Sequence, residues 1–276
     1  MLTVHNFSYG LLTPGLAYLM SCLGAFLGLR CTARARALRG PSRARWLVLG
    51  GVSIGATGIW VMHFIAMLGF AIPGQQITYN VPVTIASMLI AIAVVGAGLF
   101  IVGFGNGGPR RLLVGGLIVG IGVAAMHYLG MAAMRMPGRI TYDAPLLAVS
   151  VVIAIVAATA ALWAATALRG LLTTTIASLI MGVAVSGMHY TGMAAMRMYA
   201  SPGPAGMVMG GTGGATAESF LLPLILGISI VTFVLIATVS LSPTEEEIRN
   251  ESDLMDRISQ VRSEVQLAGQ AGSRPQ

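Results

Sequence analysis

Three histidines of this chain stand in copies of one short pattern. In each copy a methionine precedes the histidine, an aromatic residue follows it, and a second methionine stands four residues after it. The copies at 126–136 and 188–198 differ at one position, and the copy at 62–67 keeps only the first part. Because residues four apart share a helix face, each histidine would lie beside a methionine on a helix.

Imidazole nitrogen and thioether sulfur together suit copper, and thioethers favour the cuprous ion. We therefore predict a copper site built from the three histidines and the methionines that follow them. The methionines that precede the histidines point about 100° away on a helix, so they rank lower, whereas Met134 and Met196 would extend the stripe. The candidate ligands are His63, Met67, His127, Met131, His189, Met193, Met62, Met126 and Met188.

Each of these residues also has an ordinary structural interpretation. Methionine is a common flexible filler of apolar cores, and a histidine inside a membrane can simply bond a neighbouring carbonyl. Tyr128 and Tyr190 could anchor an interface or support the site. Ionisable residues inside membrane spans are costly, so their threefold recurrence favours a functional site.

The composition predicts the elements that carry the pattern. Hydrophobic residues make up 56% of the 276 residues and charged residues only 9%, which indicates an integral membrane protein and excludes a nucleic-acid-binding surface. A helix needs roughly 20 apolar residues to span a bilayer. Seven stretches qualify and predict an all-α polytopic bundle, with spans at about 11–30, 46–70, 82–104, 112–134, 146–168, 171–196 and 220–241.

The arginines predict the orientation of these spans. Nine arginines flank or fill the loops after the first, third and fifth spans, against three on the opposite side, and positive loops stay in the cytoplasm. We therefore expect the N-terminus outside, the C-terminus inside, and a location in the bacterial cytoplasmic membrane. His63, His127 and His189 would then share one depth near the outer face.

The spacing of the copies predicts an internal repeat. The three histidines are 64 and 62 residues apart, which fits three helical hairpins followed by a seventh, added span. Small residues recur four apart in the second, fourth and sixth spans, and such residues allow close helix contact. We infer that these three spans pack against one another. The small residues are Gly51, Gly55, Gly116, Gly120, Ala124, Gly182 and Ser186.

The C-terminal region differs sharply in composition from the membrane region at 1–241. We expect a cytoplasmic helix at 242–268 and a disordered tail at 269–276. Leu254, Ile258, Val261 and Val265 form a short heptad-like stripe. This stripe fits either a homodimeric coiled coil or an amphipathic helix lying against the protein or the membrane.

The repeated motif resembles that of the MHYT domain, a bacterial membrane sensor. Met188-His189-Tyr190-Thr191 is its full signature, and the copies at 126–129 and 62–65 depart at the last one and two places. The resemblance covers about residues 5–240. It implies copper binding by the motif methionines and histidines, sensing of oxygen, carbon monoxide or nitric oxide, and fusion in relatives to cytoplasmic diguanylate cyclase, phosphodiesterase or histidine kinase domains.

The sequence thus predicts a sensor of copper, redox state or a diatomic gas that signals to a cytoplasmic partner. No catalytic constellation is present, so we do not expect an enzyme. The alternative is a copper transport or delivery protein, which should show ligands deeper in the membrane, where only Ser53, Thr57 and Met181 stand. Haem is a weaker cofactor candidate, since histidines at one depth do not suit haems stacked across the bilayer.

Overall fold

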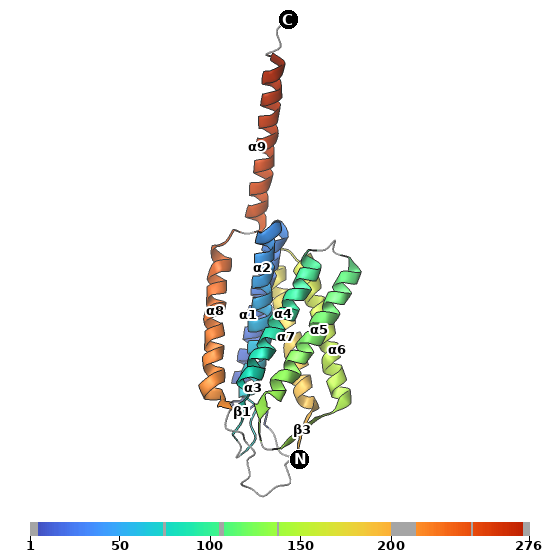
Figure 1. Cartoon of the computed structure of the whole chain (residues 1–276), viewed down its shortest axis with the longest axis vertical. Helices are drawn as coiled ribbons and strands as arrows, with labels where there is room; N and C mark the ends of the chain where they lie inside the picture. Colours follow the sequence, from blue (N-terminus) through green and yellow to red (C-terminus); the bar gives the residue numbers. More distant parts are fainter. Residues whose placement is uncertain are drawn as a thin grey trace.

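The computed structural model describes residues 5–73, 76–104, 108–136, 138–199, 214–243 and 245–272. Its helices form an upright bundle from which the last helix projects (Figure 1). The second span is continuous from α2 through the π-helix η1 to α3, and the π-helix η2 leads into α8. The helices are α1 (Leu12–Ala37), α2 (Gly40–Val52), η1 (Ser53–Val61), α3 (Met62–Leu68), α4 (Val81–Gly103), α5 (Pro109–Ala132), α6 (Ala144–Ala167), α7 (Leu171–Ala195), η2 (Ala217–Leu221), α8 (Leu222–Leu241) and α9 (Glu245–Gly272).

Within the described residues, seven helical segments are long and apolar enough to cross a membrane. They correspond to the seven predicted spans, so the sequence-based prediction of an all-α, multi-pass membrane bundle is confirmed. The expected C-terminal helix is α9, which begins at Glu245 and continues beyond residue 268 to Gly272. Of the tail expected to be disordered, residues 273–276 lie outside the described part of the chain.

Short strands gather at the end of the bundle opposite α9, which we call the strand end (Figure 1). One sheet has the order β2-β1-β5 and the other pairs β3 with β4. Their bounds are β1 (Thr78–Tyr79), β2 (Met134–Arg135), β3 (Arg139–Tyr142), β4 (Met196–Tyr199) and β5 (Ala215–Thr216).

These strands correct one prediction about the motif. Met134 and Met196 do not extend the helical stripe, because α5 ends at Ala132 and α7 at Ala195. Met134 instead pairs with Tyr79 of β1, and Met196 pairs with Tyr142 of β3. The chain leaves the helix here because antiparallel partners take up its backbone groups.

The glycine rows correct a second prediction, since they do not face one another. A Cβ added at Gly55 would meet the backbone of Ala91 in α4, one at Gly120 would meet that of Ile155 in α6, and one at Gly182 would meet Cys22 in α1. The small residues thus seat the second span against α4, α5 against α6, and α7 against α1. The three helices that carry the motif approach one another instead at the histidines.

The π-helix η1 is the most enclosed part of the bundle, because all nine of its residues are buried. A Cβ added at Gly24 of α1 would overlap the backbone of Gly58, so the two backbones are nearly in contact. The Thr57 and Thr232 hydroxyl oxygens lie 2.7 Å apart and join η1 to α8. Long π segments are rare and often occur at functional sites.

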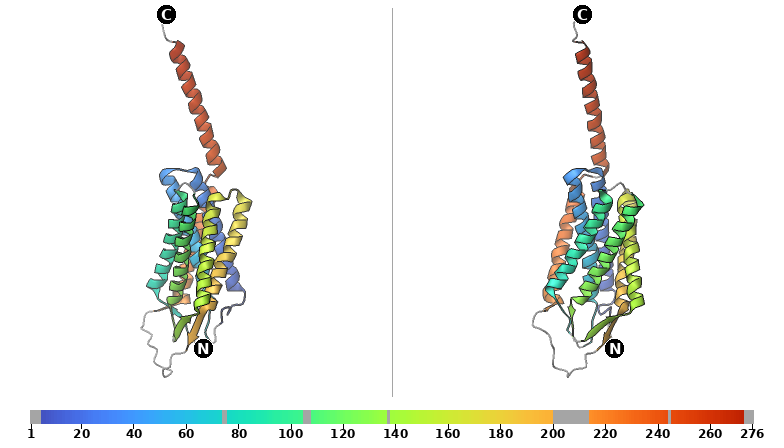
Figure 2. Two further views of the ribbon diagram at one scale, coloured as in Figure 1. Left: turned by 90° about the vertical axis from the view of Figure 1, so that its right-hand side faces the viewer. Right: turned by 45° about the vertical axis from the view of Figure 1, so that its right-hand side comes forward.

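Three arginines of α1 and α2 bond the C-terminal carbonyls of other helices at the α9 end. Arg43 donates to Gly103 at the end of α4, and Arg36 donates to Ala165 and Leu168 at the end of α6. Buried Arg34 donates to Val239, Ser242 and Pro243 around the end of α8. These carbonyls lack helical partners, so the arginines fix three helix ends on the side of the bundle from which α9 projects (Figure 2).

Candidate metal centre

Three histidines from three different helices meet inside the bundle. His63 lies in α3, His127 in the last two turns of α5, and His189 in the corresponding part of α7. Their side chains are 1%, 0% and 1% exposed. The expectation that the three copies form a single cluster is therefore confirmed, and we call this cluster the histidine triad.

The Nδ1 atoms of His127 and His189 both lie close to that of His63. The Nδ1 atom of His63 lies 3.0 Å from that of His189 and 3.1 Å from that of His127. The ring centroids are 4.9, 4.9 and 5.1 Å apart, and the rings stand nearly perpendicular to one another. The three rings thus form an almost regular triangle.

This triangle has the dimensions of a metal site. Nitrogen ligands about 2.0 Å from a zinc-sized ion are separated by roughly 3.3–3.5 Å in tetrahedral or trigonal geometry, close to the observed Nδ1 separations. In the described part of the chain, the triad is the only group of three or more histidine, cysteine or acidic side chains with ligand atoms close together, all within 4.8 Å. Its residues could hold a metal ion.

Two glycines provide the space in which the rings lie. A Cβ added at Gly130 of α5 would come 2.6 Å from the Nε2 atom of His63, and one added at Gly192 of α7 would overlap the ring of His127. Each glycine follows the histidine of its own helix by three residues. The ring of one helix therefore rests on the bare backbone of the next.

The outward nitrogens of the triad are not all satisfied. The Nε2 atoms of His63 and His127 are buried and have no hydrogen-bond partner among the described residues. An unpaired buried polar group costs about 1–3 kcal/mol, and such groups mark sites that bind or react. If Nδ1 binds an ion, Nε2 carries the proton and keeps the same surroundings, so an ion adds no further unpaired group.

The aromatic residue after each histidine packs on the ring of that histidine. Phe64, Tyr128 and Tyr190 lie edge-on to their histidines, with centroids 4.7, 5.0 and 4.9 Å apart. The Tyr128 hydroxyl is 2.6 Å from Ser150 of α6, whereas the Tyr190 hydroxyl is buried without a partner among the described residues. Each aromatic ring therefore limits the orientations that its neighbouring histidine ring can adopt.

The six methionines proposed as candidate ligands are all buried within the same bundle. Met67, Met131 and Met193 lie one turn after their histidines, but the structure establishes the convergence of the imidazoles alone, and ligation by these sulfurs stays a prediction. Of the lower-ranked Met62, Met126 and Met188, the last lines a separate apolar cavity between α6 and α7. The fourth histidine, His5, is exposed and pairs through its backbone with Ala71.

The sequence analysis missed Gly130 and Gly192 as parts of the site. Both occupy the same place in the two long copies, where a glycine inside a membrane helix lowers helix propensity and needs a packing reason. The shorter copy has Ala66 at this place. The repetition of that glycine was the signal available in the sequence.

Comparison with known proteins agrees with this site. A family described as MHYT, the bacterial signalling protein N-terminal repeat, matches residues 57–116 and 120–178, which include His63 and His127. No solved structure matches the chain.

Three relatives show the context in which such a chain is found. The bifunctional diguanylate cyclase/cyclic di-GMP phosphodiesterase MucR of Pseudomonas aeruginosa is 34% identical over 95% of this chain and 38% of its own length. The cyclic di-GMP phosphodiesterase NbdA of the same organism is 38% identical over 70% of this chain, and the signaling protein YkoW of Bacillus subtilis 29% identical over 70%, each match spanning 25% of the relative. The chain thus spans well under half of these relatives, and it belongs to the MHYT domain family of bacterial signalling proteins.

Proposed function

We propose that this chain is the membrane sensor module of a bacterial signalling system and that the histidine triad binds one copper ion. The convergence of three buried Nδ1 atoms on one centre carries the proposal. Neutral imidazoles suit copper, and thioethers would add preference for its cuprous form, with Met67, Met131 and Met193 as candidate ligands. A bound copper ion would supply a centre that changes oxidation state and accepts a diatomic ligand.

We further propose that this centre lies near the outer face of the membrane. The positive-inside rule favours a cytoplasmic location for the arginine-rich α9 end, and the strand end with the triad would then lie toward the outside. A cysteine introduced at exposed Arg39 should then react with a thiol reagent only after the membrane is opened, and one introduced at Arg139 in intact cells.

The signal would leave through η1 and α8. α3, which carries His63, continues directly from η1, and the bond between Thr57 and Thr232 joins η1 to α8. Arg34 then fixes the end of α8, beyond which α9 begins. A shift of α3 against α5 and α7 would thereby displace α9 and a cytoplasmic partner. We assign the cyclic di-GMP activities named for the relatives to the parts of those proteins that this chain does not match.

Copper transport is less well supported by the surroundings of the polar groups below the triad. Ser53 bonds the Leu49 carbonyl and Thr57 bonds Thr232, so neither group is left to pass an ion onward. Uptake of copper by vesicles containing the purified protein would overturn this preference for sensing.

Metal analysis of the purified protein tests the centre. The variant H63Q/H127Q/H189Q should lose the copper that the unaltered chain retains, because all three nitrogen ligands are removed. His5→Gln is the matched control, since His5 is exposed and lies outside the triad, and it should keep its copper. Equal copper in all three proteins would disprove the site.

A further inference from the structure

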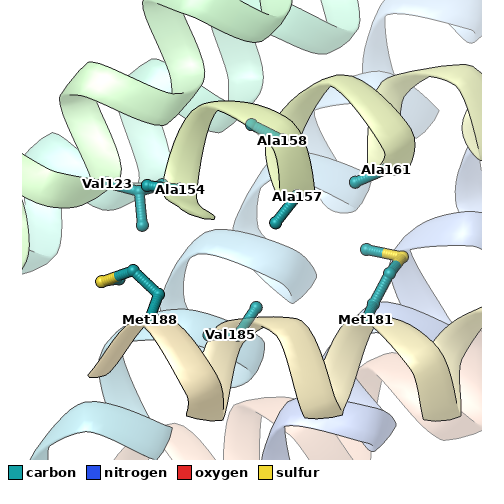
Figure 3. A pocket seen from close by; sticks show the side chains of 8 residues that line it. All are labelled: Val123, Ala154, Ala157, Ala158, Ala161, Met181, Val185 and Met188. Atoms are coloured by element: carbon teal, nitrogen blue, oxygen red, sulfur yellow. The ribbon is translucent and has the colours of Figure 1, made fainter. Parts of the chain in front are cut away.

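An apolar cavity of about 40 Å³ lies between α6 and α7, one residue away from the triad along the chain. Figure 3 shows Met181 and Met188 of α7 at its two ends, with Val185 between them and an alanine face of α6 opposite. Val123 of α5 completes the lining next to Met188. The alanines are Ala154, Ala157, Ala158 and Ala161.

The sequence explains why the two helices leave a space here. The four alanines recur at helical spacing and give α6 one flat face, which by itself would allow close packing. Met181, Val185 and Met188 recur in the same way on α7, and the two long methionine side chains keep the helices apart at both ends. Only the short side chain of Val185 lies between them, so the middle stays unfilled.

The chemistry of the lining selects the kind of molecule that fits. Every lining side chain is apolar, so a water molecule there would lack the two to four polar partners that it needs. A cavity needs roughly 10–15 Å³ to hold one water, and on that scale 40 Å³ admits a molecule of one or two heavy atoms. Enclosed apolar cavities bind xenon and other apolar molecules, and this cavity, although partly open, has the same kind of lining.

The position of the cavity indicates the route by which such a molecule would enter and leave it. Ala157 and Ala161 are only half-buried, and their neighbours Val156 and Ala160 are exposed on the outer surface of α6, where lipid chains surround the bundle. Met188, at one end of the lining, directly precedes His189 in α7. The cavity is therefore bordered by the bilayer, in which apolar gases dissolve, and by the residue next to His189.

We propose that this cavity is a docking site for a small apolar gas, such as dioxygen or nitric oxide, that enters from the lipid and reaches the triad past Met188. The part of this proposal that concerns delivery rests on the proposed metal centre. The part that concerns binding rests on the cavity alone and can be tested on the metal-free protein.

Xenon is the probe for binding, and methyl groups of methionine report it. In full-length protein labelled with ¹³C at the methionine methyls and held in lipid nanodiscs, xenon pressure should shift the Met181 and Met188 signals to saturation. The signal of Met255, which is exposed on α9, should not saturate. Shifts that rise linearly with xenon pressure, or that are equally large at Met255, would overturn the docking site. Contacts between lipid-chain methyls and both Met181 and Met188 that persist under xenon would overturn it as well.

Two substitutions and one control separate filling of the cavity from general damage. Ala157→Leu fills the cavity and should abolish the saturable shift, whereas Ala160→Leu makes the same change on the lipid-exposed side of α6 and should preserve it. Val185→Ala enlarges the cavity and should strengthen xenon binding, which keeps the test decisive if Ala157→Leu does not fold. An unchanged response in both cavity variants would contradict the proposal.

Delivery is tested by the rate at which nitric oxide reaches the copper-loaded protein. Ala157→Leu should slow this association without changing copper content, and Ala160→Leu should leave the rate unaltered. Equal rates in the two variants would reject the delivery route. Absence of copper would reject the metal centre instead, and the xenon result would stand by itself.

Discussion

Two buried groups with basic nitrogen atoms, Arg34 at the α9 end and the triad at the strand end, differ in their hydrogen-bond partners. Arg34 is 2% exposed and donates to three carbonyls around the end of α8. The triad is equally buried, yet two of its Nε2 atoms lack partners among the described residues. The Nε atom of Arg43 at the α9 end is also buried without a partner there, so the contrast holds between Arg34 and the triad and not between all nitrogens of the two ends.

This difference distinguishes the structural role that we expect for Arg34 from the ligand-binding role that we expect for the triad. Arginine keeps its charge in proteins, and three carbonyl acceptors offset the cost of burying it. A neutral imidazole keeps a free lone pair for a ligand, and the cost of its unpaired N–H must be carried by the surrounding packing. We therefore expect changes at the α9 end to alter stability, and changes at the strand end to alter metal binding.

The largest loss of stability should follow Arg34→Leu. The change removes charge-assisted bonds to three carbonyls, each worth about 1.5–3 kcal/mol, so the unfolding free energy measured by detergent denaturation should fall by about 3 kcal/mol or more. Arg45→Leu, at an exposed position in α2, should have little effect. Copper bound by folded Arg34→Leu protein should match the unaltered chain, and a loss of copper would break the separation between the two ends.

The converse result is expected for Gly192→Ala. The added methyl overlaps the ring of His127, and overpacking of this kind costs about 1–3 kcal/mol, partly offset by the roughly 1 kcal/mol that alanine gains in a helix. Copper affinity should fall more than stability does. Gly187→Ala is the matched control, because a Cβ there meets no atom within 4 Å, and titration with a copper chelator compares the two.

A smaller effect should come from Thr57→Val, which removes the bond between η1 and α8. One hydrogen bond contributes about 1 kcal/mol, and Thr232 keeps its own bond to the Ile228 carbonyl. The double variant T57V/T232V should recover part of the loss, because no buried hydroxyl then lacks its partner across the interface. Copper content should be unchanged in both, while any copper-dependent displacement of α9, followed with a spin label, should shrink.

The smallest effect, absent at neutral pH, concerns Tyr79 in β1. Burial raises the pKa of Tyr79 above its usual value near 10, so the folded protein keeps this proton while the unfolded chain loses it. Stability should therefore decline as pH rises above about 10. Ultraviolet difference titration against Tyr79→Phe measures this ionisation, and a Tyr79 that ionises near pH 10 like a free tyrosine would show that water enters the strand end.

The membrane spans and the clustering of the three histidines could be predicted from the sequence, because both follow from local rules of length, charge and repetition. The sequence was insufficient for Met134 and Met196, because only strand partners distant in the chain decide that the helix ends before them. It also assigned the glycine rows to the wrong neighbours, since glycine spacing shows that a close contact exists but not with which helix. The arginines served to predict orientation, whereas their bonds to helix ends depend on the folded arrangement.

The seating of the rings on the glycines has a mechanical consequence. His63 of α3 rests on α5 at Gly130, and His127 of α5 rests on α7 at Gly192, so neither ring can move outward without pushing the backbone of the adjacent helix. A ligand that moves these two rings away from the centre would therefore push α5 and α7 outward as well. The motif thus converts a change in the separation of the nitrogens into a change in the spacing of neighbouring helices.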